Sequence, residues 1–545
     1  MEKKKHLFFV ILSAVLVLLL IYQTDNWHLE KTYNQSKDEV APAPYLLSSC
    51  AICPKWDLED SPYQFVHQNS TAALTTEKLT SMDHVTSAAT SRVTIINRKM
   101  TYYVCDHVAV LIEARTFKNE TKHYGGDYFR TKIYSTNPYS ASGPDYFIDF
   151  QNGTYVALFT LRWTGLVKIH VSLVHPSEAV PILQRTTKDG KAGKLFTFFG
   201  IFQTETGNHT FKEDVVCSVA VMDVTPFCNV SANDTHGPWF CQRPKDSHLT
   251  CNDWAFHHMS TSKSSKKLLT TLSDTEKKIF KSSKKEVKTS EAPIYVHPRF
   301  FGSTDALPAC TSSHVLSKVE TNGLFYKDKW QPFYCNIMSF SDSDTKECLS
   351  NKKVQFFGDS TARQMFMDLK GKVKWNCSEE FFCLKGNASI RFTFHGLPIR
   401  DSHTIPVQNL SYVAREIENM KGGNDVVIVL SIWAHFGQPE GSYYRDRLLA
   451  VRGAVERLWQ RSPGTRVVVR SANTRGHSIG GFILISSDWI ALQGEQILRD
   501  VFSSDKRFDF LDVWDMSLVQ KSRDDVHPLP PTLSQLMDNL LSLIC

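Results

Sequence analysis

The chain has 545 residues, of which 42% are hydrophobic and 22% are charged. This balance is that of a globular protein with about two or three domains, and it excludes a chain too polar to bury a core. The formal net charge is +6, and much of the excess positive charge lies in residues 261–290, TSKSSKKLLTTLSDTEKKIFKSSKKEVKTS. A Lys/Ser/Thr-rich stretch with few large apolar residues predicts a solvated linker rather than a nucleic-acid-binding arm, so no nucleic acid partner is expected.

An apolar run near the N-terminus, residues 7–22, follows a short lysine-rich segment, residues 1–6. Such a run is either an uncleaved signal anchor or a signal peptide that is later removed. No A-x-A-like cleavage site follows it and the lysines before it favour a cytoplasmic N-terminus, so the pattern favours a type II anchor. Under either alternative the rest of the chain enters the secretory pathway, with residues 23–75 as a luminal stem.

The cysteines and the glycosylation sequons indicate the same compartment. Thirteen cysteines are expected to form disulfides with one left over, and Cys50-Ala51-Ile52-Cys53 is expected to be part of a structural disulfide region. The spacing of Cys241, Cys251, His257 and His258 matches no zinc finger, so no metal site is expected. Ten sequons follow the apolar run, at Asn34, Asn69, Asn119, Asn152, Asn208, Asn229, Asn233, Asn376, Asn387 and Asn409.

Short strands and turns dominate the chain from residue 93 to about residue 251. The predicted strands are β-branched or aromatic runs broken by Gly, Asn and Pro, at residues 92–97, 107–115, 129–135, 145–150, 154–163 and 166–174. Short strands at this spacing predict a β-sandwich of immunoglobulin-like type. We assign it to residues 76–258, with a Cys-rich end, and the linker to residues 259–292. No catalytic constellation is visible there, so a binding or supporting role is expected.

Strands alternate with helices after the linker. The predicted strands are residues 354–357, 390–394, 425–431, 465–471 and 508–513, and the clearest helices are residues 446–461 and 487–502. This alternation predicts an α/β three-layer domain over residues 293–545, with a parallel sheet covered on both faces. In such a sheet the chemistry gathers at the carboxyl ends of the strands.

One serine stands at such an end, in the stretch KVQFFGDSTARQMFMDL, residues 353–369. Ser360 follows a predicted strand and begins a predicted helix, whose unpaired N–H groups and dipole favour negative charge. That position suits a nucleophile and the oxyanion it generates. It suits an inert helix N-cap equally well, because serine is a preferred N-cap residue.

A base for this serine follows the last predicted strand. In SRDDVHPLPP, Asp524 and His527 have the spacing D-x-x-H, which lets a carboxylate orient an imidazole whose other nitrogen faces the serine. Asp525 is adjacent to Asp524, and the spacing alone leaves it open as the partner. Serine after the first strand combined with Asp and His after the last strand favours a Ser-His-Asp triad.

These motifs resemble those of a known superfamily. Gly358-Asp359-Ser360 with Asp524-x-x-His527 in an α/β frame is similar to the SGNH/GDSL esterases, and most of all to their PC-esterase branch. The middle of the chain resembles neurexophilin, through YGGDYFRTKIYS (124–135), VSLVHPSEAVPILQR (171–185) and GPWFCQRPK (237–245). Together the two halves resemble the neurexophilin and PC-esterase domain (NXPE) family.

The resemblance implies roles for particular residues. Ser360 would be the nucleophile, with Asp524 and His527 as the other members of the triad. The oxyanion donors would be the Gly396 N–H and His435, which takes the place of the superfamily's asparagine in Trp433-Ala434-His435. Trp433 stands where the superfamily has glycine. Arg363, one turn into the helix, is a candidate for holding an acidic sugar, and a place on a solvated helix face is the alternative.

The resemblance also implies a function. We expect a Golgi acyl-serine enzyme that transfers acetyl groups to glycan hydroxyls, with sialic acid on mucin-type glycoproteins as the acceptor. Acetyl-CoA is expected as the acyl donor by analogy. One alternative is a carbohydrate O-acetyl esterase, since both reactions use the same triad. Another is a secreted or membrane-tethered ligand that binds a cell-surface protein through the β-sandwich.

Overall fold

The computed structural model describes most of the chain beyond residue 80. The described residues are 45–47, 53, 81–96, 98–187, 198–221, 226–260, 266–282, 285–301, 307–316, 319–400, 403–437, 441–476, 483–520 and 526–545. The expected signal anchor, residues 7–22, lies outside these ranges. Within them, none of the helices combines the length and the apolar character that crossing a membrane requires.

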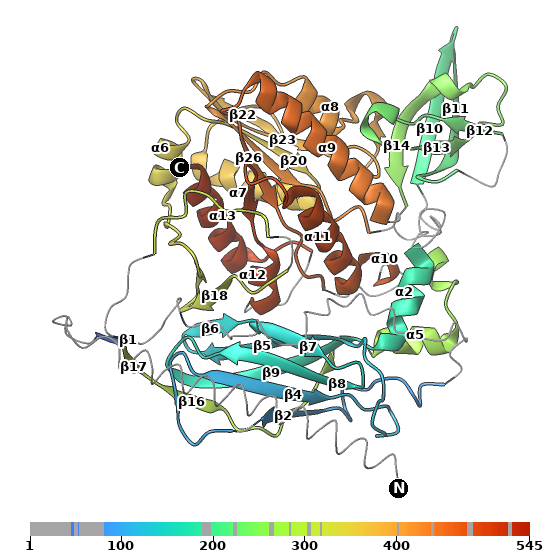
Figure 1. Ribbon diagram of the computed structural model, residues 1–545. Helices are drawn as coiled ribbons and strands as arrows, with labels where there is room; N and C mark the ends of the chain where they lie inside the picture. Colours follow the sequence, from blue (N-terminus) through green and yellow to red (C-terminus); the bar gives the residue numbers. More distant parts are fainter. Residues whose placement is uncertain are drawn as a thin grey trace.

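Two sheets pack face to face in the N-terminal half, and we refer to them below as the sandwich. Most of their strands are drawn in blue and cyan in Figure 1, whereas β16 and β18 are drawn in yellow shades. One has the order β2-β4-β8-β7, and the larger has the order β19-β18-β6-β5-β9-β16-β3. The first sheet contains β2 (Arg92–Ile96), β4 (His107–Glu113), β7 (Tyr146–Asp149) and β8 (Thr154–Thr160). The second contains β3 (Tyr102–Tyr103), β5 (Tyr128–Thr136), β6 (Tyr139–Ser142), β9 (Gly165–His175), β16 (Ile294–His297), β18 (Gly323–Tyr326) and β19 (Lys329–Pro332).

The two sheets share one core because alternate residues of their strands are apolar. In β4, Val108, Val110 and Ile112 are buried while the residues between them are partly exposed. They pack in one cluster with Ile133 of β5 and Val171 of β9. The six strands expected in this region are therefore present within a few residues. Three further strands of the larger sheet, β16, β18 and β19, come from chain that follows residue 293.

A third sheet is formed by the cysteine-rich residues 198–259. Its order is β12-β13-β11-β10-β14-β24, and it stands beside α8 and α9, apart from the sandwich strands (Figure 1). The strands are β10 (Phe198–Thr206), β11 (His209–Ser218), β12 (Phe227–Asn229), β13 (Phe240–Gln242), β14 (Trp254–Met259) and β24 (Ile405–Pro406). The last of these belongs to the C-terminal half, so the two halves share this sheet. We refer to residues 198–259 below as the Cys-rich module.

The Lys/Ser/Thr-rich stretch differs from the solvated linker expected there. It contains helix α5 (Asp274–Lys281). Ser273 and Glu276 form a capping box at the N-terminus of this helix. Leu268, Leu272 and Ile279 are buried, in the same cluster as α2 (Val180–Thr187). Strand β15 (Lys285–Glu286) then pairs with β9. The few apolar residues of the stretch are enough to hold it against the protein because they recur on one side of its helical turns.

The C-terminal sheet has the order β21-β22-β23-β20-β25-β26-β27. From β23 to β27 the neighbouring strands are parallel. The bounds are β20 (Lys353–Gly358), β21 (Asn376–Glu379), β22 (Phe382–Lys385), β23 (Ala388–Phe394), β25 (Val426–Ser431), β26 (Arg466–Arg470) and β27 (Asp509–Leu511). The chain starts at β20, crosses to β23 on one side and then to β25 on the other. Ligands of α/β proteins bind where the strand order reverses in this way, beyond the carboxyl ends of the strands.

Helices pack against this sheet from the two faces of β25. Val427 and Val429 of β25 pack in the cluster that contains α7 and α13, whereas Ile428 and Leu430 pack in the cluster that contains α8, α9 and α11. The bounds are α7 (Ser360–Val373), α8 (Val413–Glu418), α9 (Gly441–Arg461), α11 (Asp488–Phe502) and α13 (Pro530–Ile544). Shorter helices are α6 (Asp342–Cys348), α10 (Ile483–Ser486) and α12 (Trp514–Val519).

The disulfides and sequons fit an oxidising compartment. Twelve cysteines pair, as Cys53–Cys105, Cys217–Cys241, Cys228–Cys251, Cys310–Cys335, Cys348–Cys545 and Cys377–Cys383. Cys53 therefore bonds to Cys105 rather than to Cys50, which lies outside the described residues. Of the eight sequon asparagines that the structure describes, seven are exposed and Asn152 is half-buried.

Candidate active site

Helix α7 begins at Ser360, directly after a constrained turn. Asp359 is the N-cap residue, and its carboxylate accepts a hydrogen bond from the Thr361 N–H at 2.8 Å. Asp359, not Ser360, therefore caps the helix, which contradicts the N-cap alternative for the serine. Gly358 has φ +155°, and a Cβ placed there would lie 2.0 Å from the Ser431 carbonyl oxygen. Only glycine allows β20 to turn this close to the end of β25.

Ser360 and His527 meet at this turn. The His527 Nε2 lies 2.9 Å from the Ser360 Oγ, and both side chains are half-buried. Gln364 of α7 donates to the Pro528 carbonyl at 2.8 Å, which ties the histidine segment to the helix that carries the serine. The pair is the geometry that a serine nucleophile and its base require. Asp524 and the alternative Asp525 lie outside the described residues.

The Asp359 carboxylate joins the serine turn to the segment after β25. One oxygen accepts from the N–H and hydroxyl of Thr361, at 2.8 and 2.6 Å. The other accepts from the backbone N–H groups of Trp433 and Ala434, at 3.1 and 2.6 Å. Asp359 is fully buried, so all four bonds are shielded from water. We did not predict this role from the sequence, although Asp359 is the central residue of the Gly-Asp-Ser motif.

Two histidines from different loops lie beside the same turn. The backbone N–H of His395 donates to the Gly358 carbonyl at 3.1 Å. In the His395 side chain, the Nε2 lies 2.9 Å from the His435 Nδ1. Burial lowers the pKa of His395 to about 4. Burial also lowers the pKa of His435 well below its ordinary value, with further lowering by His395 and by three arginines. Both imidazoles are therefore neutral at pH 7.

Gly396 follows His395 on the same loop and has φ +80°. A Cβ there would lie 2.7 Å from the Ser411 carbonyl oxygen and 2.7 Å from the Tyr412 ring. This crowding explains the glycine structurally. The structure thus brings Gly396 and His435 to the turn that carries Ser360, from the ends of β23 and β25.

Three arginines surround His435. Its pKa is lowered electrostatically by Arg400, Arg475 and Arg363. Arg363 lies over the Phe394 ring at 5.6 Å. The Arg400 Nη1 donates to the Ser486 hydroxyl at 2.7 Å, and the Arg475 Nη1 donates to the Ala434 carbonyl at 3.2 Å. Arg363 was identified from the sequence, whereas Arg400 and Arg475 were missed because the loops that carry them have no motif.

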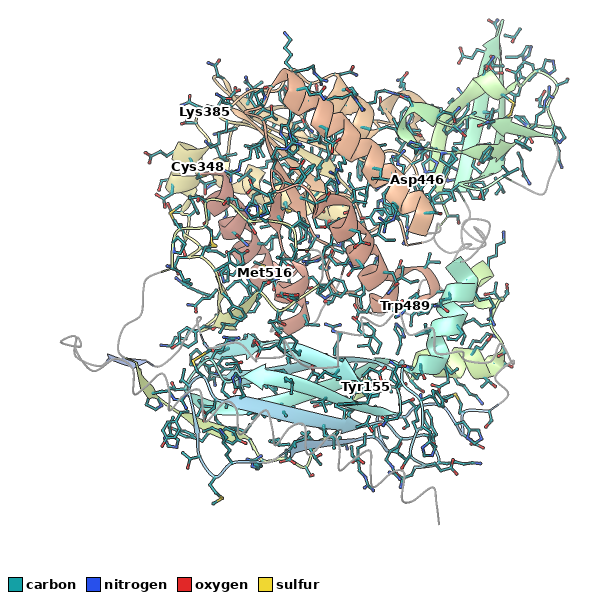
Figure 2. All side chains as sticks on the ribbon, in the orientation of Figure 1. Tyr155, Cys348, Lys385, Asp446, Trp489 and Met516 are labelled. Atoms are coloured by element: carbon teal, nitrogen blue, oxygen red, sulfur yellow. A yellow bond between two sulfur atoms is a disulfide. The ribbon has the colours of Figure 1, made fainter. Side chains whose placement is uncertain are left out.

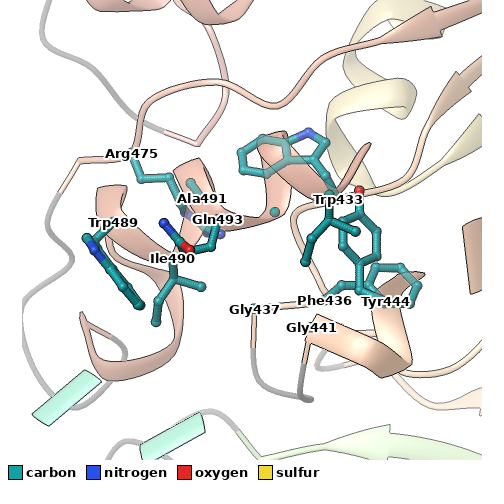
Figure 3. A pocket seen from close by; sticks show the side chains of 12 residues that line it. Trp433, Phe436, Gly437, Gly441, Tyr444, Arg475, Trp489, Ile490, Ala491 and Gln493 are labelled. Carbon is teal, nitrogen blue, oxygen red and sulfur yellow. The ribbon is translucent and has the colours of Figure 1, made fainter. Parts of the chain in front are cut away.

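A pocket adjoins the Trp433 segment, with a cavity volume of about 230 Å³. Figure 3 shows Trp433, Phe436 and Tyr444 on one side and Trp489, Ile490 and Arg475 on the other. The Trp433 Nε1 also donates to the Thr361 hydroxyl at 3.3 Å, so one side chain contacts both the pocket and the serine turn. In the part of the chain that the structure describes, no group of three or more His, Cys, Asp or Glu residues could hold a metal ion.

Two family models match separate parts of the chain. Residues 330–545 match the family model "NXPE family member 4-like, C-terminal domain", and residues 77–291 match the model "Neurexophilin". The chain is also similar to the N-acetylneuraminate (7)9-O-acetyltransferase of Danio rerio, with 24% identity over 251 residues. That match covers 42% of this chain and 29% of the relative, so it spans well under half of the relative's length.

Proposed function

We propose, since the chain belongs to the NXPE family, that it is an acyl-serine enzyme which transfers an acetyl group to a glycan hydroxyl. The observation that carries this proposal is the 2.9 Å contact between the Ser360 Oγ and the His527 Nε2 at the start of α7. We assign the reaction to residues 293–545, as a domain of the SGNH, PC-esterase type. The preferred acceptor is sialic acid on glycoproteins, as the name of the Danio rerio relative suggests.

The first half-reaction forms an acyl-enzyme. His527 takes the proton of the Ser360 hydroxyl as the oxygen attacks the carbonyl carbon of an acetyl thioester, with acetyl-CoA as the proposed donor. The bond from carbon to sulfur breaks, and the thiolate leaves with the proton that His527 carries. Asp524, by the family pattern, would orient the imidazole and stabilise its charged form.

The oxyanion of this step needs donors that are already in place. We assign them to the Gly396 N–H and to His435. A neutral His435 whose Nδ1 accepts from the His395 Nε2 carries its proton on Nε2 and is a donor there. The lowered pKa values of both histidines support this neutral pair, because a charged imidazole would lose the acceptor nitrogen.

The second half-reaction transfers the acetyl group to an acceptor oxygen. His527 removes the proton of a sugar hydroxyl, whose oxygen attacks the acyl-serine and releases Ser360. The arginines near His435, with the Trp433 and Trp489 rings at the pocket, suit an acidic sugar, which needs a cation for its carboxylate and an aromatic face for its ring. Water in place of the sugar gives an O-acetyl esterase, the alternative that shares every residue of the site.

We place the protein in the secretory pathway, because six disulfides and exposed sequon asparagines suit that compartment. With residues 7–22 uncleaved it would be a type II protein of the Golgi lumen, and with them removed it would be secreted.

A second candidate function is a ligand for a cell-surface protein, which the match of residues 77–291 to the Neurexophilin model favours. A truncation near residue 255 would not test it cleanly, because strands β16, β18 and β19 of the sandwich lie beyond that point. Full-length Ser360→Ala protein separates the two functions, because it removes the nucleophile and leaves the sandwich intact.

The enzyme proposal is tested with purified protein, acetyl-CoA and a sialylated glycoprotein. Mass spectrometry should find an acetyl group on the peptide that contains Ser360 and on the sialic acid of the acceptor. Ser360→Ala and His527→Ala should abolish both signals, whereas Ser350→Ala, at an exposed serine between α6 and β20, should retain them. Equal transfer by wild type and Ser360→Ala would reject the proposal, and release of free acetate without transfer would indicate the esterase.

A further inference from the structure

The Cys-rich module contacts the C-terminal domain through a short 3-10 turn, η3 (Asn233–Thr235). Asp234 of this turn forms two hydrogen bonds with Arg415 of α8, at 3.0 and 2.7 Å, and both side chains are exposed. Thr235, which is buried, accepts two hydrogen bonds from the Arg447 Nη1 of α9, at its carbonyl (3.1 Å) and at its hydroxyl (3.3 Å). One turn therefore has an exposed contact and a buried contact with the same domain.

The buried contact continues to the candidate active site. The Arg447 Nη2 donates to the His395 carbonyl at 2.9 Å, and the guanidinium lies 4.9 Å from the centre of the Tyr412 ring, which packs against Gly396. His395 in turn lies 2.9 Å from His435. Arg447 is 5% exposed, so water does not compete for its carbonyl partners. A guanidinium fork that bridges two carbonyls fixes the distance between them more tightly than a single ammonium can.

The sandwich reaches the same segment from another side. Arg130 of β5 pairs with Asp488 at the start of α11, at 2.6 Å. Asp488 is fully buried and also accepts from the Arg475 N–H, and Arg475 donates to the Ala434 carbonyl at 3.2 Å. Trp489, labelled in Figure 2, follows Asp488 in the chain and packs in the cluster that contains Leu183 of α2. Two parts of the N-terminal half thus hold the loops of Gly396 and His435.

We propose that the neurexophilin-like half is a positioning part of the catalytic unit, and that Arg447 of α9, which Thr235 of that half holds, is the main positioning residue. The neurexophilin-like half acts through the contacts of Thr235 with Arg447 and of Arg447 with His395. These contacts fix the positions of the His435 imidazole and of the Gly396 N–H, and the neurexophilin-like half does not touch the substrate. The rate effect of this arrangement rests on the proposed function, whereas its structural effect does not. A displacement of about 1 Å in such a donor can cost on the order of 10²-fold in rate.

Arg447→Lys and Arg415→Lys form a matched pair for the test, since both residues contact the same turn and only Arg447 continues to His395. In the full-length protein, Arg447→Lys should lower kcat for acetyl transfer about 10- to 100-fold, with KM close to that of Arg415→Lys. Arg415→Lys should keep the wild-type kcat. A kcat for Arg447→Lys equal to that of Arg415→Lys would overturn the proposal.

Gly237→Ala tests the same link from the Cys-rich module, in case Arg447→Lys folds poorly. Its Cβ would lie 2.7 Å from the Arg447 Nη1 and 2.9 Å from the Tyr412 ring, so it should displace the guanidinium and lower kcat in the same direction. A wild-type kcat in this variant would count against the proposal.

Hydrogen exchange measured by mass spectrometry tests, independently of activity, whether Arg447 holds the loops of Gly396 and His435 in place. Peptides that cover residues 390–400 and 431–437 should exchange faster in Arg447→Lys than in Arg415→Lys, with α13 unchanged in both. If the wild-type protein transferred no acetyl group, the proposed function would fail, and this exchange difference would still support the positioning link. Equal exchange in the two variants would overturn it.

Discussion

The Asp359 carboxylate accepts a hydrogen bond from the Ala434 N–H at 2.6 Å, across the ends of two neighbouring parallel strands. Because the other carboxylate oxygen holds Thr361, this one side chain fixes the start of the serine helix relative to the loop of His435. A charged acceptor in a buried place makes stronger hydrogen bonds than a neutral one. The candidate nucleophile and the candidate oxyanion donor are therefore parts of one hydrogen-bonded unit.

Asp359→Asn should damage this unit while leaving the fold in place. An asparagine has one acceptor oxygen, and its NH₂ group would face N–H donors on the other side, so the bonds to Trp433 and Ala434 or those to Thr361 would be lost. We expect acetyl transfer to fall about 10²-fold or more, as when an oxyanion donor is lost. Transfer kinetics together with a circular dichroism spectrum would measure this. Wild-type kinetics would show that the carboxylate is not required.

Gly358→Ala should abolish activity and destabilise the protein, because its Cβ would lie 2.0 Å from a backbone oxygen that cannot move aside. Gly371→Ala in α7 is the matched control. No atom lies within 4 Å of the added Cβ there, so we expect it to raise stability by roughly 0.5 to 1 kcal/mol. Thermal unfolding of both variants measures the effect, and a stable, active Gly358→Ala protein would contradict the turn geometry.

Lys122→Met tests the buried ion cluster of the sandwich. The Lys122 ammonium is fully buried, 3.1 Å from Asp127 and 3.0 Å from Glu178. Removing it leaves two carboxylates without their cation, which should cost about 3 to 5 kcal/mol of unfolding free energy. Lys118→Met, which breaks the exposed pair with Asp83, should leave the unfolding free energy close to that of the wild-type protein. Equal losses in denaturant titrations would show that the burial of Lys122 has no energetic effect.

The unfolding free energy of the protein should decrease at acidic pH, partly because His257 is buried in its neutral form. Burial lowers its pKa from 6.5 to about 4, so between these values the unfolded state takes up a proton that the folded state does not. Stability from this group is therefore complete above about pH 6.5 and is lost as the pH falls toward 4.

His257→Gln should reduce that acid loss by roughly 3 kcal/mol, because glutamine does not titrate and still donates to the Ile399 carbonyl. The measurement is the unfolding free energy of wild type and variant at several pH values between 4 and 7. Parallel curves for the two proteins would show that His257 titrates normally in the folded state. His395 and Glu495 are present in both proteins, so their own titrations cancel in the comparison.

The sequence could predict those site residues whose position follows from the end of a parallel strand. Ser360 and His527 are 167 residues apart, yet their places after the first and last parallel strands bring them to one edge of the sheet. The N-cap alternative for Ser360 was wrong because Asp359 fills that role. Asp524 stays a prediction.

The contacts that could not be predicted join segments with no shared pattern. Arg447 lies on the second turn of a long helix and meets Thr235 of another module, and nothing in either segment indicates a partner. Helix α5, which buries one face, was missed because the lysines, serines and threonines of residues 261–290 outnumber the few apolar residues that hold the stretch in place.

The central claim is that Ser360 carries an acetyl group to a glycan hydroxyl. The most direct measurement is mass spectrometry of sialylated glycans from cells that express the wild-type protein or Ser360→Ala, with Ser350→Ala as the control. We predict O-acetylated sialic acid with wild type and with Ser350→Ala, and background levels with Ser360→Ala at equal expression. The same level of sialic acid O-acetylation with Ser360→Ala as with wild type would contradict the claim.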